Sequence, residues 1–209
     1  MKIKKRLKNY VWRSVILKWL YECVYLEVLF WKRRNYRVLG KDSTNRVEIP
    51  RDTYCDDLRI VFKGKNNVIK IGRGCKFYRT NQIYIQDDGN QLIIGDNVTF
   101  DQNVSIVLGE GTTCQIGDDC IFANGVRIRT CDQHFIYDDS GLRINPSKDV
   151  HIDNHVWLGA SVIVMKGAEI GPGTVIGMNA MVTKHVPANC IAVGQPAKVI
   201  KSNIYWKEY

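Results

Sequence analysis

The stretch Val156–Val186, VWLGASVIVMKGAEIGPGTVIGMNAMVTKHV, decides the fold of this chain. It repeats an aliphatic residue at every sixth position: Leu158, Val164, Ile170, Ile176 and Val182. A small or β-branched residue follows each of them by four positions: Val162, Ala168, Thr174, Ala180 and Val186. A period of six fits neither a helix nor an alternating strand, but it is typical of a parallel β-helix in which three hexapeptides close one coil. We expect the aliphatic residues to point into a three-sided prism, and Gly159, Gly171 and Gly177 to supply unusual backbone angles at its corners.

The same pattern extends toward the N-terminus with insertions. Segments that begin at Ile60, Ile83 and Ile106 each contain a strand, a polar turn, a second strand and an Ile-Gly pair. Their extra residues, KGKNN, QDDGNQ and LGEGTT, have the composition of hairpin-like turns. The inward positions that this register predicts are Ile71, Phe77, Ile83, Ile94, Phe100, Ile106, Ile116, Phe122, Ile128, Ile152, Leu158, Val164, Ile170, Ile176 and Val182.

One excursion interrupts the register, the segment 130–151 with the sequence TCDQHFIYDDSGLRINPSKDVH. Loops of this length inside a compact fold are usually functional. The chain is therefore predicted to be mainly β, with a helical arm over residues 1–42 and a β-helix domain over 43–190. That domain includes the long loop 130–151, and residues 191–209 form a C-terminal tail.

The positive charge belongs to one segment. The chain has a net charge of +9, and residues 1–41 hold 12 of its 30 Lys and Arg residues but only 2 of its 21 acidic ones. Four charges interrupt the apolar part of this segment, which argues against a spanning helix: Arg13, Lys18, Glu22 and Glu27.

Two interpretations of the arm stay open. It packs as a helix against the prism or a neighbouring subunit, or it makes a peripheral membrane contact in which basic residues meet anionic lipid. The second interpretation has three aromatic anchors: Trp12, Trp19 and Trp31. A nucleic-acid arm is disfavoured because no groove-reading or base-stacking motif accompanies the charge.

His134 is the candidate general base. A neutral imidazole accepts a proton near physiological pH, and a carboxylate such as Asp132 or a backbone carbonyl could fix its tautomer. An exposed loop histidine is the simpler explanation. We expect no metal site, because the chain has no CxxC pair. His151 and His155 are four residues apart, but in the repeat they occupy outward positions and do not share one face of a helix. The seven cysteines are expected to be reduced packing residues of a cytosolic protein.

The hexapeptide register, the looped-out histidine, HVWLGASV and GQPAK together resemble the left-handed β-helix acetyltransferases. The segment 128–159 is especially similar to bacterial capsular polysaccharide O-acetyltransferases, including those that modify sialic acid polymers. The resemblance covers about residues 60–206 and leaves out the first 41. The family often has His-Pro at the loop histidine, whereas Phe135 follows His134 here.

The resemblance implies direct transfer of an acetyl group. His134 would take the proton from a sugar hydroxyl as that oxygen attacks the thioester, and the amide of Ala160 would stabilise the oxyanion. Trp157 would lie beside the acceptor or support the loop. Asn103 would position the acceptor, or it is a corner asparagine with positive φ.

The resemblance also implies acetyl-CoA as the cosubstrate, held in a crevice between two prisms of a homotrimer. Ala160, Ala180 and Thr183 match residues along the pantetheine, and Pro196 matches one that packs against adenine. The phosphate-binding residues would be Lys184, Lys198 and Lys201, although each is also explained as ordinary surface.

An acidic acceptor is attractive because Arg127, Arg129 and Arg143 flank the loop and could bind carboxylates. We therefore expect an O-acetyltransferase of a bacterial surface glycan or its precursor, in the cytoplasm or at the inner face of the membrane. The alternatives are acetylation of a small sugar nucleotide or an antibiotic, and a non-catalytic β-helix scaffold.

Overall fold

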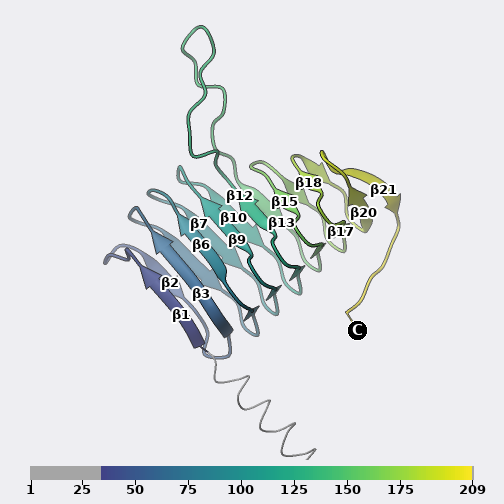
Figure 1. Cartoon of the computed structure of the whole chain (residues 1–209), viewed down its shortest axis with the longest axis horizontal. Coiled ribbons are helices and arrows are strands. Elements are labelled where there is room, and N and C mark those ends of the chain that lie inside the picture. Colours follow the sequence, from purple (N-terminus) through teal and green to yellow (C-terminus); the bar gives the residue numbers. More distant parts are fainter. Residues whose placement is uncertain (1–33, 209) are drawn as a thin grey trace, which may run out of the picture. The chain divides into compact units, whose positions relative to one another are not determined.

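The computed structural model describes residues 34–208, and every helix or strand assigned in this range is a β-strand. The strands stack in parallel, coil upon coil, into a left-handed parallel β-helix with three faces (Figure 1). This confirms the predicted fold class. Residues 1–33, which hold most of the predicted arm and its tryptophans, lie outside the described residues.

Each face of the prism collects one strand from each coil. Face 1 contains β5 (Lys76–Phe77), β8 (Thr99–Phe100), β11 (Ile121–Phe122), β14 (Trp157–Leu158), β17 (Val175–Ile176) and β20 (Cys190–Val193). Face 2 contains β3 (Tyr54–Phe62), β6 (Asn81–Ile85), β9 (Ser105–Leu108), β12 (Arg127–Arg129), β15 (Ile163–Val164) and β18 (Met181–Val182). Face 3 contains β2 (Arg46–Glu48), β4 (Val68–Ile71), β7 (Gln91–Ile94), β10 (Thr113–Ile116), β13 (Val150–Ile152), β16 (Glu169–Ile170) and β19 (His185–Val186).

The core follows the predicted register. All fifteen predicted inward residues are at most 5% exposed. Three inward phenylalanines of face 1 form a column: the rings of Phe77 and Phe100 stack with centroids 4.4 Å apart, and Phe122 meets Phe100 edge-on at 5.0 Å. Because the same side chains recur one coil above another, the hydrophobic core is continuous along the stack.

The corners require two different kinds of residue. Between faces 1 and 2 the left-handed conformation recurs in successive coils, at Thr80, Asn103, Gly125, Ser161 and Asn179. The positions directly after the inward residues require glycine for a different reason. A Cβ on Gly159 would lie 2.8 Å from the amide nitrogen of Met178, and one on Gly171 would lie 2.6 Å from that of Ala188. The expected unusual backbone angles at Gly159, Gly171 and Gly177 are therefore wrong, because the close approach of the next coil is what demands glycine there.

A buried polar ladder occupies the corner between faces 2 and 3. Asn67 Nδ2 donates to Asn45 Oδ1 and Asn90 Nδ2 donates to Asn67 Oδ1, each at 3.2 Å. The amide of Thr112 donates to Asn90 Oδ1 at 3.1 Å, and its hydroxyl lies 2.6 Å from that of Thr130. The insertions predicted as polar turns thus supply internal hydrogen bonds that lead to the first residue of the excursion.

Each end of the described unit contains a strand that the repeat does not predict. β1 (Arg34–Leu39) pairs with β3, so these residues of the predicted helical arm form a strand, and the compact unit starts at Asn35. In the predicted tail, β21 (Lys198–Ser202) pairs antiparallel with β20. Between residues 34 and 208, no helix is suited to crossing a membrane.

Candidate active site

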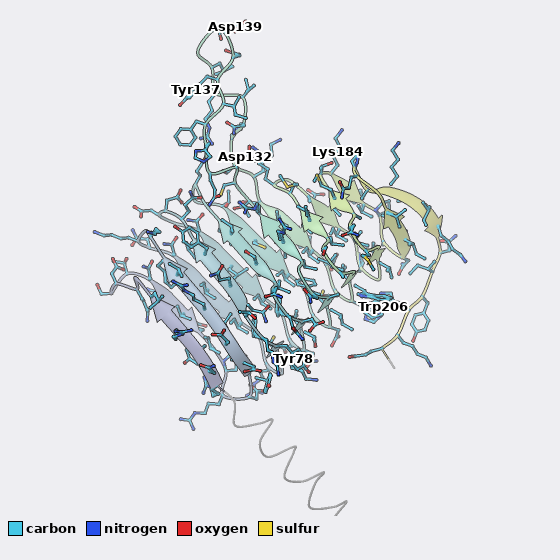
Figure 2. All side chains as sticks on the ribbon, in the orientation of Figure 1. Tyr78, Asp132, Tyr137, Asp139, Lys184 and Trp206 are labelled. Atoms are coloured by element: carbon cyan, nitrogen blue, oxygen red, sulfur yellow. The ribbon has the colours of Figure 1, made fainter. Side chains whose placement is uncertain are left out.

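The excursion is an ordered hairpin that leaves the coils between β12 and β13 (Figure 1). Lys148 N donates to the carbonyl of Thr130 at its base (3.0 Å), and Ile144 N donates to Ile136 O further out (2.9 Å). Asp138 closes the tip by accepting hydrogen bonds from the amides of Ser140 and Leu142. Figure 2 shows Tyr137 and Asp139 far out on the hairpin and Asp132 at its base.

Five apolar side chains of the hairpin face solvent, each between 52% and 66% exposed: Phe135, Ile136, Tyr137, Leu142 and Ile144. Isolated exposed apolar residues are common, but a cluster on a projecting segment is typical of a surface that another molecule covers.

Asn145 fixes the backbone around His134. Its Nδ2 donates to the carbonyl of His134 (2.8 Å), and its Oδ1 accepts from the amide of Ile136 (2.7 Å). The same Nδ2 also donates to Asp132 Oδ2 (2.9 Å), and the Asn145 side chain is buried. The loop that carries His134 is therefore held by side-chain hydrogen bonds, although no strand encloses it.

Asp132 anchors the loop, and no hydrogen bond joins it to the imidazole of His134 within the described residues. Its Oδ2 pairs with Lys166 Nζ from the next coil at 2.5 Å, besides accepting from Asn145. Partial burial alone would raise the pKa of Asp132, but the hydrogen bonds from Lys166 and Asn145 outweigh it and hold the pKa below its usual value. Lys166 and Asn145 thus engage Oδ2 of Asp132, and the predicted catalytic role of Asp132 beside His134 stays a prediction.

The Arg143 side chain likewise binds other residues of the same chain. Its Nη2 donates to Glu110 Oε1 at 2.6 Å, and its guanidinium lies over the Phe135 ring at 4.1 Å. The hydrogen bond from Arg143 holds the pKa of Glu110 below its usual value. Arg143 is therefore a support of the hairpin and not the free carboxylate binder that we predicted. Phe135, which stands where the resembled family often has proline, supplies the ring for this contact.

His134 itself is exposed, and its ring makes no hydrogen bond with any of residues 34–208. Two arginines on β12 precede it on the outer surface of face 2. Arg129 Nη1 donates to Gln133 Oε1 (3.1 Å), and within the described part of the chain neither Arg127 nor Arg129 pairs with a carboxylate. The imidazole and two uncompensated positive charges thus lie at the start of the same hairpin.

Trp157 and Ala160 lie on the other side of the coil. Trp157 points outward from face 1 and is 42% exposed. Ala160 occupies the corner between faces 1 and 2, and its amide donates no hydrogen bond to any residue in the described range. An unused amide at a fixed corner is what an oxyanion donor requires.

One chain does not bring these groups together. The His134 hairpin leaves the corner between faces 2 and 3, which is opposite face 1, where Trp157 lies. The hydrophobic core fills the space between them. A site that uses both residues therefore needs a second copy of the chain.

The predicted cofactor residues divide into two groups. The exposed ones are Thr183, Lys184, Pro196, Lys198 and Lys201, and Figure 2 shows Lys184 pointing away from the coils. Ala180 has no exposed surface, its amide donates to Gly177 O and its carbonyl accepts from Ile163 N. The predicted cofactor contact of Ala180 is wrong, because the residue belongs to the core. Asn103 adopts φ 58° at its corner, which confirms the conformational explanation; its acceptor contact stays a prediction.

The remaining histidines do not converge. His151 and His185 lie on face 3 on either side of Glu169, and His185 Nδ1 is 3.6 Å from a Glu169 oxygen. His155 occupies the corner between faces 3 and 1. In the described range, no three His, Cys, Asp or Glu side chains form a group that could hold a metal ion. Burial raises the pKa of Cys131 at the base of the hairpin, so this thiol is not an activated nucleophile.

Sequence reasoning missed Asn145, Lys166 and Trp206. Asn145 and Lys166 hold the hairpin, and Trp206 contacts His155 and Trp157. Lys166 lies in the regular repeat, where its partner Asp132 is 34 residues away. Trp206 lies after the repeat ends, so no period predicts its position.

Comparison with known proteins agrees with this geometry. The bacterial transferase hexapeptide model, which describes six repeats, matches residues 149–184. A polysialic acid O-acetyltransferase of Neisseria meningitidis is 34% identical over 193 residues, which cover 82% of this chain and 88% of that protein. A polysialic acid O-acetyltransferase of Escherichia coli O1:K1 is 40% identical over 119 residues, 56% of this chain but only 38% of that protein. The crystal structure of the polysialic acid O-acetyltransferase OatWY superposes with a TM-score of 0.68 at 31% identity, over 83% of this chain and 92% of that one.

Proposed function

The chain belongs to the hexapeptide-repeat O-acetyltransferases that include the polysialic acid O-acetyltransferases, and we propose that it acetylates an acidic bacterial surface polysaccharide from acetyl-CoA. The observation that carries the proposal is the anchored hairpin, which carries His134 and follows directly on β12, where neither Arg127 nor Arg129 pairs with a carboxylate of the described residues. Such a site combines a proton acceptor with a charged surface that fits a polyanion.

His134 acts as the general base in this proposal. Its exposed imidazole takes the proton of the acceptor hydroxyl while that oxygen attacks the carbonyl carbon of the acetyl thioester. The thiolate of coenzyme A leaves when the tetrahedral intermediate collapses, and the imidazolium returns its proton to that sulfur. The free amide of Ala160 donates to the oxyanion, which lowers the barrier without a covalent enzyme intermediate.

Acetyl-CoA is the donor. The relatives named above are O-acetyltransferases. This chain offers exposed Thr183 and Lys184 at the corner between faces 2 and 3, and exposed Pro196 between β20 and β21. Three exposed lysines in the C-terminal part of the chain could bind the phosphates: Lys184, Lys198 and Lys201. Because the donor is a cytoplasmic metabolite, we place the reaction in the cytoplasm or at the inner face of the membrane.

The active unit is a homotrimer in this proposal. His134 and Trp157 lie on opposite sides of one prism, so the complete site combines the hairpin of one subunit with face 1 of the next. The exposed apolar side chains of the hairpin supply a surface for that contact. Three equivalent sites follow from three equivalent interfaces.

Release of free thiol from acetyl-CoA, measured against a panel of acceptors, tests the proposal. We expect turnover with polysialic acid or another acidic polysaccharide, little with a neutral polysaccharide, and a weaker signal with monomeric sialic acid. Arg129→Gln should raise the KM for the acidic polymer about tenfold, since one charge-assisted contact is lost, and should leave the KM for acetyl-CoA unchanged.

The panel also separates the alternatives. If a sugar nucleotide or an antibiotic supports turnover and no polysaccharide does, the acceptor is a small molecule and not a polymer. Absence of thiol release with every acceptor, from a protein that is a folded trimer, would contradict the enzymatic function.

A further inference from the structure

The C-terminal tail returns to the coils after β21 (Figure 1). The amide of Ile204 donates to the carbonyl of Asn189 at 3.0 Å, which holds the tail at the corner between faces 3 and 1. Two residues later the indole of Trp206 stacks on the imidazole of His155, with centroids 4.0 Å apart and planes 4° from parallel. The tail thereby reaches the coil that carries Trp157, and Figure 2 labels Trp206 at this position.

Two reciprocal hydrogen bonds reinforce the stack. Trp206 Nε1 donates to the carbonyl of His155 at 3.1 Å, and His155 Nε2 lies 3.0 Å from the carbonyl of Trp206. Because a carbonyl oxygen only accepts, Nε2 of His155 carries the hydrogen in this contact. Each of the two residues thus binds the ring and the backbone of the other, which fixes the orientation of the indole.

The backbone conformation at position 155 does not require a histidine. His155 has φ 56°, and the equivalent corner positions of the other coils are occupied by Gly74, Asn97, Asp119, Gly173 and Asn189. Gly, Asn and Asp tolerate this left-handed conformation best, and any of them would satisfy the corner. What histidine adds in this coil is the ring on which Trp206 stacks.

The fixed indole lies beside the candidate acceptor residue. The ring centroids of Trp157 and Trp206 are 5.9 Å apart, and the planes are inclined by 48°. Along face 1 the outward neighbours of Trp157 are Ile121 and Val175, so the surface around the indole is apolar. Trp157 nevertheless keeps 42% of its surface exposed, which leaves part of its ring open to a ligand.

We propose that Trp206 is a positioning residue for Trp157, and that the two indoles form a platform against which a pyranose ring of the acceptor packs. The inference rests on the proposed function, since Trp157 needs an acceptor sugar to bind. The C–H bonds on the face of a pyranose pack well on an indole, and two inclined indoles contact one ring from two sides. His155 holds Trp206 in place through ring stacking and the two hydrogen bonds.

Two variants and a neighbouring control test this inference in the full-length protein. Trp206→Ala removes the second indole, and His155→Asn releases it without strain, because asparagine already occupies the same corner at Asn97 and Asn189. Tyr205→Ala is the control, because Tyr205 is 83% exposed and makes no ring contact or hydrogen bond in the described range. We expect the acceptor KM to rise about three- to tenfold in both variants, with the KM for acetyl-CoA unchanged and the control like wild type.

The outcomes are distinguishable from those of the proposed function. If the wild type acetylates a polysaccharide but the acceptor KM of both variants equals that of Tyr205→Ala, the platform is wrong and the proposed function stands. An equal rise in both KM values would also overturn it, because a general structural defect has that signature. If the wild type acetylates no glycan, both the proposed function and the indole platform are wrong. Should Trp206→Ala fail to fold, Trp206→Phe, which keeps a stacking ring but no indole N–H, should give an intermediate acceptor KM.

Discussion

At the scale of single residues, Asn145 does more for the candidate site than the carboxylate that sequence reasoning favoured. It binds the backbone on both sides of Phe135 through His134 O and Ile136 N, and it shares Asp132 with Lys166. A general base must be held within hydrogen-bonding reach of its substrate, so an anchored loop is the prerequisite for its chemistry. The histidine was visible in the sequence because it interrupts a regular repeat, whereas its anchors were not, since nothing local marks them.

The Asp132–Lys166 pair should make the anchor pH-dependent. The pKa of Asp132 in the folded protein is below its ordinary value of 3.8, so the stabilisation is present above that pH and is lost as the pH falls through the lower folded pKa. We expect Asp132→Asn to lower the free energy of unfolding by about 1 kcal/mol at pH 7, because the pair is only partly shielded from water. The difference in Tm between wild type and Asp132→Asn should shrink as the pH falls below 3.8.

The matched control is Asp139→Asn at the tip of the same hairpin, where Asp139 makes no hydrogen bond or ion pair within residues 34–208. Its Tm should follow that of the wild type at every pH. A Tm difference for Asp132→Asn that persists unchanged to pH 2 would argue against an ionised anchor.

At the scale of elements, the coils are stacked so closely that some positions between them have room only for glycine. A Cβ at Gly117 would lie 2.6 Å from the amide nitrogen of Asn154 in the next coil, whereas one at Gly89 would meet nothing closer than 3.8 Å. Gly89 is instead in the left-handed conformation, with φ 76°. The two glycines therefore separate the cost of overpacking from the cost of backbone strain.

We predict that Gly117→Ala lowers the free energy of unfolding by about 2 kcal/mol or more, because the neighbouring backbone has to move. Gly89→Ala should lower it by about 1 kcal/mol, which is the strain of a left-handed alanine. Thermal or denaturant unfolding of the two variants measures the difference. Equal losses in both variants would show that the spacing between coils adjusts at little cost.

The period of six predicted the fold because each coil must bury the same positions, and the inward register holds from Ile71 to Val182. It also located the excursion that carries His134. It did not predict the strand Arg34–Leu39 or the antiparallel β21, because neither continues the repeat. The period did not predict the role of Trp206 either, because a contact between residues 155 and 206 leaves no local pattern in the sequence.

At the scale of the whole molecule, the proposed active site is shared between subunits. His134→Ala and Trp157→Ala chains, each weakly active alone, should therefore complement each other when they are co-expressed with different tags and purified as mixed trimers. Each mixed trimer then has about one site in three with both residues intact if they come from different subunits, and none if they come from the same one. Mixed trimers no more active than the two variants assayed separately would contradict the shared site.

Residues 1–33 of the predicted arm lie outside the described residues, so both interpretations of the arm stay predictions. Its basic and aromatic composition predicts binding to anionic vesicles or support of the oligomer. Deletion of residues 1–33, followed by vesicle sedimentation and light scattering, separates the two roles.

The central claim is that this chain transfers acetyl groups with His134 as the base, and the turnover of His134→Ala tests it most directly. The measurement is thiol release from acetyl-CoA with the best polysaccharide acceptor, with His185→Ala, an exposed histidine of face 3, as the matched control. We predict that kcat falls about 10²- to 10⁴-fold in His134→Ala, with the KM for acetyl-CoA unchanged and His185→Ala fully active. A trimeric His134→Ala protein that keeps the wild-type kcat would contradict the account.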